Sequence, residues 1–410
     1  MKSFDHQNHK IELLAPAGNM EKLEIALHYG ADAVYLAGKD YSLRNFSTNF
    51  TLDEMQKALQ MVHAHDKKAY IAVNIFPANE DLPHIESYIN QISTLKPDGI
   101  IVADPAILSI TRNIAPQIPI HLSTQANTTN WRAAKFWENQ GVKRINTARE
   151  LTLAQIEQIA RSCELEIEAF VHGAMCIAYS GRCLLSSFMA QRSSNQGMCC
   201  QPCRFKYAVV EELRPGQYFD VDEDQRGTYI FNSRDLCMIS HIGQMVQSGI
   251  TTLKIEGRMK SIHYAATTVK TYREAIDHYY QAPDRFNFQP YWQTELDKIT
   301  NRGYCTGFYL GAPAETAPRY NAPQPSNFPL VAKVLKSLNG GKAYIEVRNQ
   351  IRPGQTIEII TPKGPPIEDT IQCIEDADGR LLKVAQPGSL VTVQLKTRCH
   401  ALDLFRGRIT

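Results

Sequence analysis

The sequence has little net charge and no long apolar run, and each shortage excludes a class of protein. Of its 410 residues, 44 are Lys or Arg and 42 are Asp or Glu, giving a formal charge of +2. A chain so balanced has no general attraction to nucleic acid, which a local basic patch would have to supply. No stretch has the roughly 18 apolar residues of a membrane-spanning helix. Because the opening MKSFDHQNHK also lacks the apolar core of a signal peptide, we expect a cytoplasmic protein.

Several catalytic motifs are also missing. The sequence has no HExxH of a zinc peptidase, no GxSxG of a serine hydrolase, and no nucleophile with an evident base. It has neither a Walker A motif nor GxGxxG, which argues against an NTPase or a dinucleotide enzyme. No haem signature and no triad of two histidines and a carboxylate stands out. Oxygen activation by mononuclear iron is therefore not indicated.

Cysteine is sparse over most of the chain but concentrated in one segment. Five of the ten cysteines lie within 33 residues: Cys176, Cys183, Cys199, Cys200 and Cys203. Structural disulfides are rare in the cytosol, so such a cluster indicates metal binding or catalysis. The spacing C-x6-C-x15-C-x3-C of four of them suits an iron–sulfur cluster or a structural zinc. Zinc is the weaker interpretation, because zinc sites usually use two C-x2-C pairs and Cys200 and Cys203 form the single one here. A third alternative is that these cysteines are buried and act only as small apolar side chains.

Short β-branched runs alternate with helical patterns over the first 280 residues or so. Strands are expected at 11–16, 32–38, 68–76, 99–105, 120–127, 143–148, 166–173 and 251–258. Strand followed by helix, eight times over, is typical of parallel βαβ units, and the length matches a TIM-like (β/α)8 barrel. A doubly wound open sheet is the alternative, because periodicity cannot prove that the sheet closes.

One connection between the expected strands is far longer than the rest. Six of the seven strand-to-strand spacings lie between about 20 and 36 residues, whereas that from Glu166 to Thr251 is 85. All five clustered cysteines fall in this insertion, at the barrel mouth where such enzymes place their active sites. A sixth, Cys237, is expected to open the helix that follows it. Loops so long inside a compact domain are usually functional.

The chain is expected to divide into three parts. Residues 1–282 form the barrel, with the cysteine-rich insertion at about 173–235. Residues 283–329 are rich in Pro, Asn and aromatic residues, which predicts a helix and a linker. Residues 330–410 alternate at period two between turns, which predicts a small antiparallel β-barrel.

Charged residues near the last two barrel strands are candidates for catalysis. His172 is the last polar residue of the expected seventh strand. It is either a proton donor, a ligand of the substrate, or a buried histidine of the barrel with no role in the reaction. Lys254 and Glu256 alternate along the eighth strand and should face the interior, either as catalytic groups or as a structural ion pair. Arg258 and Lys260 follow that strand and are candidates to bind a phosphate or a carboxylate.

Uncharged amides end two other strands. Asn74 lies near the end of the third strand, and Gln125 and Asn127 end the fifth. Amides at these positions suit the edge of a nucleobase, and hydrogen bonding within loops would explain them equally well.

Several motifs resemble those of peptidase family U32, the collagenase-like proteins. They are ELLAPAGNMEKLEIALHYGADAVYLAG, EAFVHGAMCIAYSGRCLLSSFM, NQGMCCQPCR, NSRDLC, LKIEGRMKS and NRGYCTGF, and together they span nearly the whole chain. Despite the family's name, the resemblance implies an oxygen-independent hydroxylase with a 4Fe-4S cluster. Branches of the family act on the wobble uridine of tRNA, on a cytidine of large-subunit rRNA or on ubiquinone precursors. Chain length and the short β-domain are most similar to the tRNA branch.

The resemblance also implies a set of cluster ligands. Cys176 and Cys183 match the two cysteines of the signature, and Cys199 matches the one after the Asn-Gln-Gly run. Cys203 is the preferred fourth ligand, with Cys237 the alternative. A helix N-terminus at Cys237 would lower its thiol pKa, which also suits a ligand.

The implied reaction is 5-hydroxylation of the wobble uridine, with prephenate as hydroxyl donor. A dicarboxylate donor needs cations at the mouth, and Arg182, Arg258 and Lys260 are the candidates. The tRNA anticodon loop is expected to spread over the mouth and the β-domain, with one base splayed into a pocket. Three alternatives stay open: a collagenase-like peptidase, a hydroxylase of rRNA or a quinone precursor, and an RNA-binding module with structural zinc.

Overall fold

The computed structural model describes residues 10–42, 49–176, 178–181, 183–192, 194–204, 208–210, 218–220, 234–311 and 327–407. Arg182 lies outside these ranges. No helix within them is both long and apolar enough to cross a membrane.

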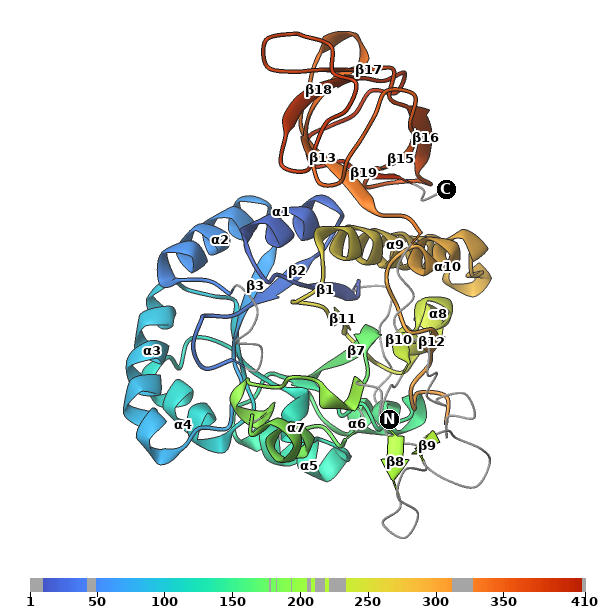
Figure 1. The fold of residues 1–410 in the computed structure, drawn as a ribbon. Coiled ribbons are helices and arrows are strands. Elements are labelled where there is room, and N and C mark those ends of the chain that lie inside the picture. Colours follow the sequence, from blue (N-terminus) through green and yellow to red (C-terminus); the bar gives the residue numbers. More distant parts are fainter. Residues whose placement is uncertain are drawn as a thin grey trace.

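Eight parallel strands close into a barrel (Figure 1). They are β1 Glu12–Pro16, β2 Ala33–Leu36, β3 Lys68–Val73, β4 Gly99–Val102, β5 Ile120–Leu122, β6 Arg144–Asn146, β7 Glu166–Ala174 and β11 Thr252–Ile255. The last strand pairs on both sides, since Leu253 lies opposite Leu13 of β1 and Ala169 of β7. This closure confirms the TIM-like barrel and excludes the open sheet.

Helices surround the barrel and cover the outward faces of its strands. They are α1 Met20–His28, α2 Leu52–Ala64, α3 Leu82–Thr94, α4 Pro105–Ile114, α5 Trp131–Asn139, α6 Leu153–Ser162, α8 Ile242–Gln247 and α9 Ile262–Gln281. Side-chain caps set where several begin: Asn19 accepts from the N–H of Lys22, and Thr51 and Glu54 form a capping box. Such caps satisfy backbone donors that the first turn of a helix leaves unpaired.

The predicted insertion follows β7 at the carboxyl end of the barrel strands. It contains α7 Leu185–Ala190 and the short strands β8 Ala208–Val210, β9 Tyr218–Asp220 and β10 Asp235–Cys237. The expected helix start at Cys237 is wrong, because Asp235–Cys237 pairs antiparallel with the end of β7. Strand β12, Tyr304–Cys305, pairs with β10 in turn. Pairing with the end of β7, which extends beyond its contact with β6, outweighs the helical pattern at Cys237, and helical turns begin at Ile239.

The C-terminal domain is a curled antiparallel sheet, a half-barrel, as the alternating pattern predicts. Its strands are β13 Leu330–Ser337, β14 Lys342–Val347, β15 Thr356–Ile360, β16 Ile367–Thr370, β17 Cys373–Glu375, β18 Leu390–Gln394 and β19 Leu404–Gly407. Their order in the sheet is β16-β15-β19-β13-β14-β18-β17. The inward faces share an apolar core that includes Ile345, Val393 and Phe405.

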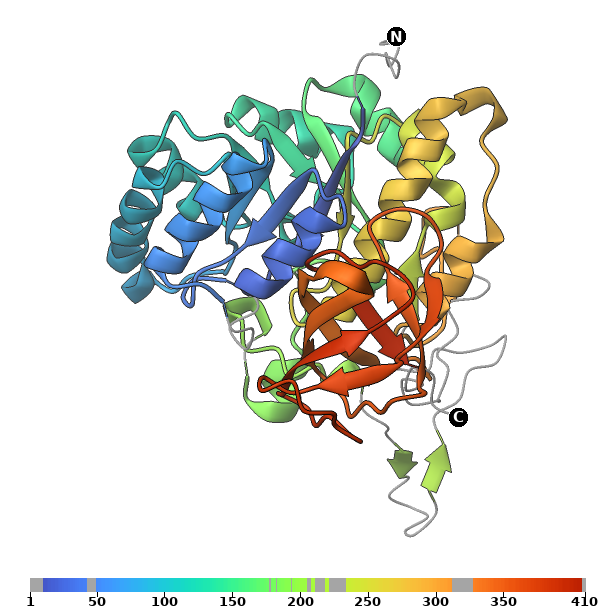
Figure 2. The same cartoon turned by 90° about the horizontal axis from the view of Figure 1, so that it is seen from above.

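Buried polar contacts fix this domain against the barrel. The hydroxyl of Tyr29, the residue that follows α1, donates to the carbonyl of Ile360 at 2.7 Å. The guanidinium of Arg406 is wholly buried and donates to Glu295 at 2.7 Å; Glu295 lies on α10, Pro290–Asp297. Figure 2 shows the domain against the flank formed by α1 and α9, extending toward the end of the barrel that carries α7.

A candidate active site at the barrel mouth

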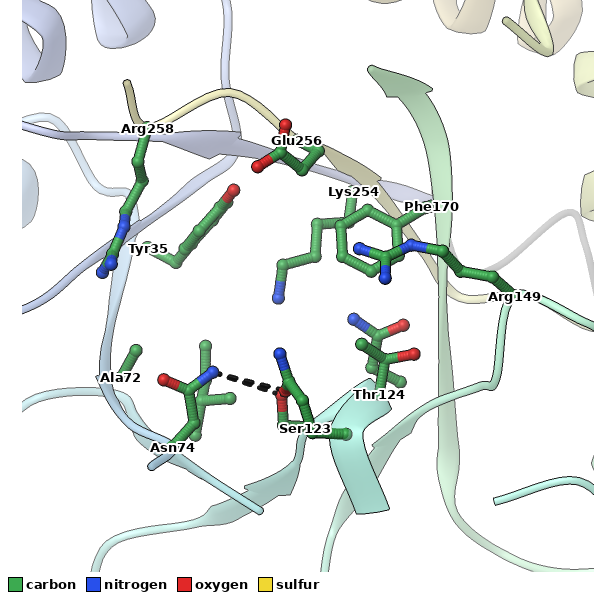
Figure 3. Close-up of a pocket in the computed structure, with 13 residues that line it drawn as sticks. Tyr35, Ala72, Asn74, Ser123, Thr124, Arg149, Phe170, Lys254, Glu256 and Arg258 are labelled. Carbon is green, nitrogen blue, oxygen red and sulfur yellow. Dashed lines mark hydrogen bonds between the residues drawn. The ribbon is translucent and has the colours of Figure 1, made fainter. Parts of the chain in front are cut away.

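A pocket opens at the carboxyl ends of the barrel strands (Figure 3). Its lining residues are Tyr35, Ala72, Asn74, Ile101, Ser123, Thr124, Gln125, Asn146, Arg149, Phe170, Lys254, Glu256 and Arg258. They come from β2 to β7, from β11 and from the loops that follow these strands. Strand closure therefore gathers at one point residues that lie more than 200 positions apart in the sequence.

Lys254 points into the middle of this pocket (Figure 3). Its ammonium lies 4.5 Å from the ring centre of Tyr35 and 5.6 Å from that of Phe170. Nζ donates to Oε1 of Glu168 at 2.6 Å, and both side chains are buried. Burial lowers the pKa of the Lys254 ammonium, and the carboxylate of Glu168 partly offsets that effect. Lys254 is thus a donor-only group at the pocket, held by one carboxylate and two aromatic faces.

The partner of Lys254 differs from the one that the sequence suggests. Period-two alternation points to Glu256 as its ion-pair partner, but the structure pairs Lys254 with Glu168 on β7. Lys254 and Glu168 are on adjacent strands, whereas Glu256 lies past the end of β11, on the pocket wall. Arg144 lies behind Glu168, at 3.8 Å, and binds Glu12 at 2.7 Å. This network compensates the charges that the barrel interior buries.

Arg149 forms the pocket wall next to the cysteine-rich insertion. Its guanidinium carbon lies 4.2 Å from the ring centre of Phe170, a cation–π contact. Nη1 donates to Sγ of Cys176 at 3.6 Å. A single side chain therefore contacts both the pocket and the first cysteine of the insertion.

The amides after β3 and β5 form a connected group on the opposite wall. Nδ2 of Asn74 donates to Oγ of Ser123 at 3.5 Å and to Oε1 of Gln125 at 3.4 Å (Figure 3). Ser123 also donates to Oε1 of Gln125. Gln125 lies on a short 3-10 turn, Thr124–Ala126, rather than on the expected strand.

Asn146, the last residue of β6, differs from these amides. Its side chain is 2% exposed. Neither Oδ1 nor Nδ2 has a hydrogen-bond partner in the described part of the chain. Arg258 is also buried, and its Nη2 donates to Oγ of Ser42 at 3.2 Å.

Part of the cysteine-rich insertion is fixed onto the barrel mouth. The N–H of Phe76 donates to the carbonyl of Asn195 at 3.0 Å, and Nδ2 of Asn127 donates to the carbonyl of Ser180 at 3.3 Å. At Gly181, a Cβ atom would collide with the carbonyl oxygen of Gln125, and φ is +74°. Glycine therefore permits the close approach of this loop to the β5 connection.

The cysteines of the insertion lie at different depths. Cys176 is exposed, while Cys183, Cys199, Cys200 and Cys203 are partly buried. Sγ of Cys199 accepts from the N–H of Gln201 at 3.4 Å. Cys200 is paired with the hydroxyl of Ser186, at 3.2 Å.

These thiols are the donor type that a 4Fe-4S cluster takes. Within the ranges that the structure describes, however, no three His, Cys, Asp or Glu side chains converge closely enough to hold a metal ion. The donor chemistry thus suits a cluster, but the side chains are not arranged as an assembled site.

Cys237 and His172 lie together, away from the pocket lining. Each is the other's partner in the pairing of β10 with β7. Burial raises the thiol pKa of Cys237 to about 11, the opposite of the lowering expected from a helix N-terminus. Burial likewise lowers the pKa of His172 to about 3, and its ring lies among those of Tyr264, Tyr272 and Tyr304.

The structure thus brings together five of the residues selected from the sequence. Asn74, Gln125, Lys254, Glu256 and Arg258 line the pocket. Three others lie outside the lining: His172 lies among tyrosine rings, Asn127 anchors the insertion, and the ammonium of Lys260 lies 5.2 Å from the ring centre of Tyr264.

Eight of the 13 lining residues are not among those selected from the sequence: Tyr35, Ala72, Ile101, Ser123, Thr124, Asn146, Arg149 and Phe170. Tyr35 and Phe170 lie in apolar runs, which predict side chains of the hydrophobic core. Arg149 lies in a loop without a recognisable motif. Asn146 gave no distinct signal, because its strand, Arg144–Asn146, holds a single apolar residue.

Models of two domain families match this chain. Peptidase family U32 matches residues 18–318, and the peptidase family U32 C-terminal domain matches residues 326–406. The chain belongs to peptidase family U32. A relative named tRNA hydroxylation protein P1, from Bacillus subtilis strain 168, is 39% identical over 400 residues, covering 97% of this chain and 94% of the relative.

Two further relatives in the family also align over nearly their full length. The tRNA hydroxylation protein P of Escherichia coli K12 is 36% identical, covering 94% of this chain and 93% of the relative. A protein named collagenase, from Porphyromonas gingivalis strain W83, is 30% identical, covering 96% of this chain and 97% of that protein. The names of these relatives therefore point to two different activities.

Proposed function

We propose that this protein is a tRNA hydroxylase that converts the wobble uridine of the anticodon to 5-hydroxyuridine. The observation that carries the proposal is the mouth pocket, which combines two aromatic rings, three amides and three cations beside a cysteine-rich insertion. The two relatives named for tRNA hydroxylation support it, because they align over more than nine-tenths of both chains. A peptidase finds less support, since the pocket hydroxyl of Ser123 donates to the amide of Gln125 and Lys254 donates to Glu168, so neither is paired as nucleophile and base.

The pocket suits a single base taken from an RNA loop. Bases in unpaired loops are splayed out, placed against aromatic side chains and read along their hydrogen-bonding edges. Tyr35 and Phe170 offer the aromatic faces, and Asn74, Gln125 and Asn146 offer amides. We place the rest of the anticodon loop over the mouth and the β-domain, which extends toward that end of the barrel (Figure 2).

Hydroxylation at C5 removes two electrons from the base as C5–H becomes C5–OH. In a balanced transfer the C–O bond of the donor breaks, its oxygen ends on C5 of the base, and the donor carbon takes up the two electrons and the proton displaced from C5. Donor C–OH thus becomes C–H, and dioxygen is not required. We propose prephenate as this donor, as the family resemblance implies. Arg149, Lys254 and Arg258 line the pocket and would bind its carboxylates.

We further propose a 4Fe-4S cluster held by Cys176, Cys183, Cys199 and Cys203, with Cys237 as the alternative fourth ligand. A cluster with an accessible iron supplies a Lewis acid or an electron-transfer centre. The chemistry and spacing of these thiols support the cluster, while the described side chains form no converged group of ligands. Arg149 would then lie at the boundary between cluster and pocket, through its contact with Cys176.

Complementation tests the proposal. A bacterial strain lacking its own tRNA hydroxylation protein P would express this chain, and nucleosides from purified tRNA and from large-subunit rRNA would be measured by mass spectrometry. We expect 5-hydroxyuridine in tRNA with the wild type and none with Lys254→Met. Hydroxycytidine in rRNA alone, or no hydroxylated nucleoside from well-expressed protein, would contradict the proposal.

A further inference from the structure

The side chain of Asn146 is buried beside the pocket without a partner for either of its polar atoms. It is 2% exposed, and among the described residues Oδ1 and Nδ2 make no hydrogen bond. A buried amide without hydrogen-bond partners destabilises a folded protein, because it loses its hydrogen bonds to water and gains none within the protein. Such a group therefore suggests a bound partner.

The other amides around the mouth are already engaged. Asn74 and Gln125 bond with Ser123, and Asn127 donates to the carbonyl of Ser180. Asn146 is fixed by the pairing of β6 with β7, opposite Glu168, which holds Lys254. It is therefore a rigidly placed amide, next to the lysine's own anchor, with its hydrogen-bonding capacity unused.

We propose that Asn146 binds the imide edge of the target uracil, an inference that rests on the proposed function. An amide presents one acceptor and one donor side by side. Oδ1 would accept from N3–H of the base, and Nδ2 would donate to the adjacent carbonyl. Lys254, which has only donors, favours a carbonyl of uracil over the exocyclic amino group of cytosine.

Binding of modified RNA tests this assignment. An anticodon stem-loop carrying uridine at the wobble position is compared with one carrying N3-methyluridine, which lacks the N3–H donor. We expect the wild type to bind the methylated RNA about 10-fold more weakly, as the loss of a hydrogen-bonded pair implies. Asn146→Leu should bind both RNAs with the same, weaker affinity. Discrimination retained in Asn146→Leu, or absent from the wild type, would overturn the assignment.

Thermal unfolding separates binding from a structural role. Asn146→Leu removes an unsatisfied buried amide, so its melting temperature should equal or exceed that of the wild type. The matched control is Asn130→Leu, because Asn130 caps α5 by accepting from the N–H of Ala133 at 3.0 Å. That variant should melt earlier and still discriminate between the two RNAs. A fall in melting temperature for Asn146→Leu would indicate a structural amide and overturn the assignment.

The outcomes distinguish this inference from the proposed function. If the wild type hydroxylates tRNA and Asn146→Leu does so with the same kcat/KM, the assignment of Asn146 is contradicted while the proposed function stands. If the wild type neither binds the uridine stem-loop nor hydroxylates tRNA, both fall together.

Discussion

Arg149 and Cys176 are in direct contact, Nη1 to Sγ at 3.6 Å, where the barrel pocket meets the cysteine-rich insertion. The same guanidinium lies over the ring of Phe170 in the pocket. This contact, together with the anchoring of Ser180 and Asn195, places part of the insertion at the mouth. Arg149 therefore connects the pocket to Cys176, the first of the proposed cluster ligands.

Arg149→Gln should lower kcat/KM for tRNA hydroxylation by about 10-fold or more, because it removes a charge-assisted contact and a cation–π contact at the site. The fold should survive, since the side chain is only partly buried. Arg132→Gln is the control, because the Arg132 guanidinium lies over Trp131, on a helix outside the pocket lining. Equal kinetics for the two variants would remove Arg149 from the site.

Glu168→Gln should lower the free energy of unfolding by about 3 kcal/mol, since it leaves the buried ammonium of Lys254 without its carboxylate. Chemical denaturation of the purified protein measures this change. A free energy of unfolding equal to that of the wild type would show that the Lys254–Glu168 ion pair does not stabilise the barrel.

The double variant Lys254→Met/Glu168→Leu separates stability from function. Replacing both charges with apolar side chains should recover part of the stability lost in Glu168→Gln. Hydroxylation should stay absent, because the pocket has lost its central donor. Recovered activity would show that Lys254 serves the fold alone.

The fold could be predicted well from the sequence, and the site only in part. Strand positions follow from apolar runs of the right length, so seven barrel strands fall within the expected ranges and β7 extends one residue beyond its range, to Ala174. Ion-pair partners depend on the register between neighbouring strands, which a single sequence does not specify, so Glu168 could not be foreseen. Cys237 shows the same limit, because pairing with the end of β7 overrode a local helical pattern.

Cys176→Ala and Cys183→Ala should lose iron from anaerobically purified protein, along with the absorbance near 400 nm typical of 4Fe-4S proteins. Cys163, Cys305, Cys373 and Cys399 lie outside the insertion and should tolerate the same change. Iron analysis and visible spectra give the result. Colourless wild-type protein with zinc, or loss of iron in Cys373→Ala, would contradict the ligand set.

The fourth ligand is tested by Cys203→Ala against Cys237→Ala. We expect iron and activity to be lost in the first and iron to be retained in the second. Cys237 is buried beside Tyr272, whose hydroxyl lies 3.7 Å from Sγ, so its removal should mainly reduce stability. Cys200→Ala serves as control, because Cys200 is already paired with Ser186. Iron kept without Cys203 and lost without Cys237 would move the fourth bond to β10.

His172 should make folding sensitive to acid rather than take part in catalysis. Burial lowers its pKa from 6.5 to about 3. The unfolded chain therefore binds a proton below pH 6.5 that the folded chain does not. The free energy of unfolding therefore keeps the full contribution of neutral His172 above pH 6.5, and this contribution is lost as the pH falls toward 3.

His172→Phe should accordingly flatten the dependence of unfolding free energy on pH, by up to about 1.4 kcal/mol per pH unit below pH 6. Denaturant titrations between pH 4 and 7 measure the slope. A slope unaltered in His172→Phe would show that the residue is protonated in the folded state.

The central claim is that the mouth pocket hydroxylates uridine in tRNA without dioxygen. The most direct test incubates anaerobically purified protein, reconstituted with iron and sulfide, with unmodified tRNA and prephenate, and measures the nucleosides by mass spectrometry. We predict 5-hydroxyuridine with the wild type, none without prephenate, and none with Lys254→Met. No hydroxylated uridine from cluster-loaded wild-type protein, together with steady cleavage of denatured collagen, would contradict the account and favour a peptidase.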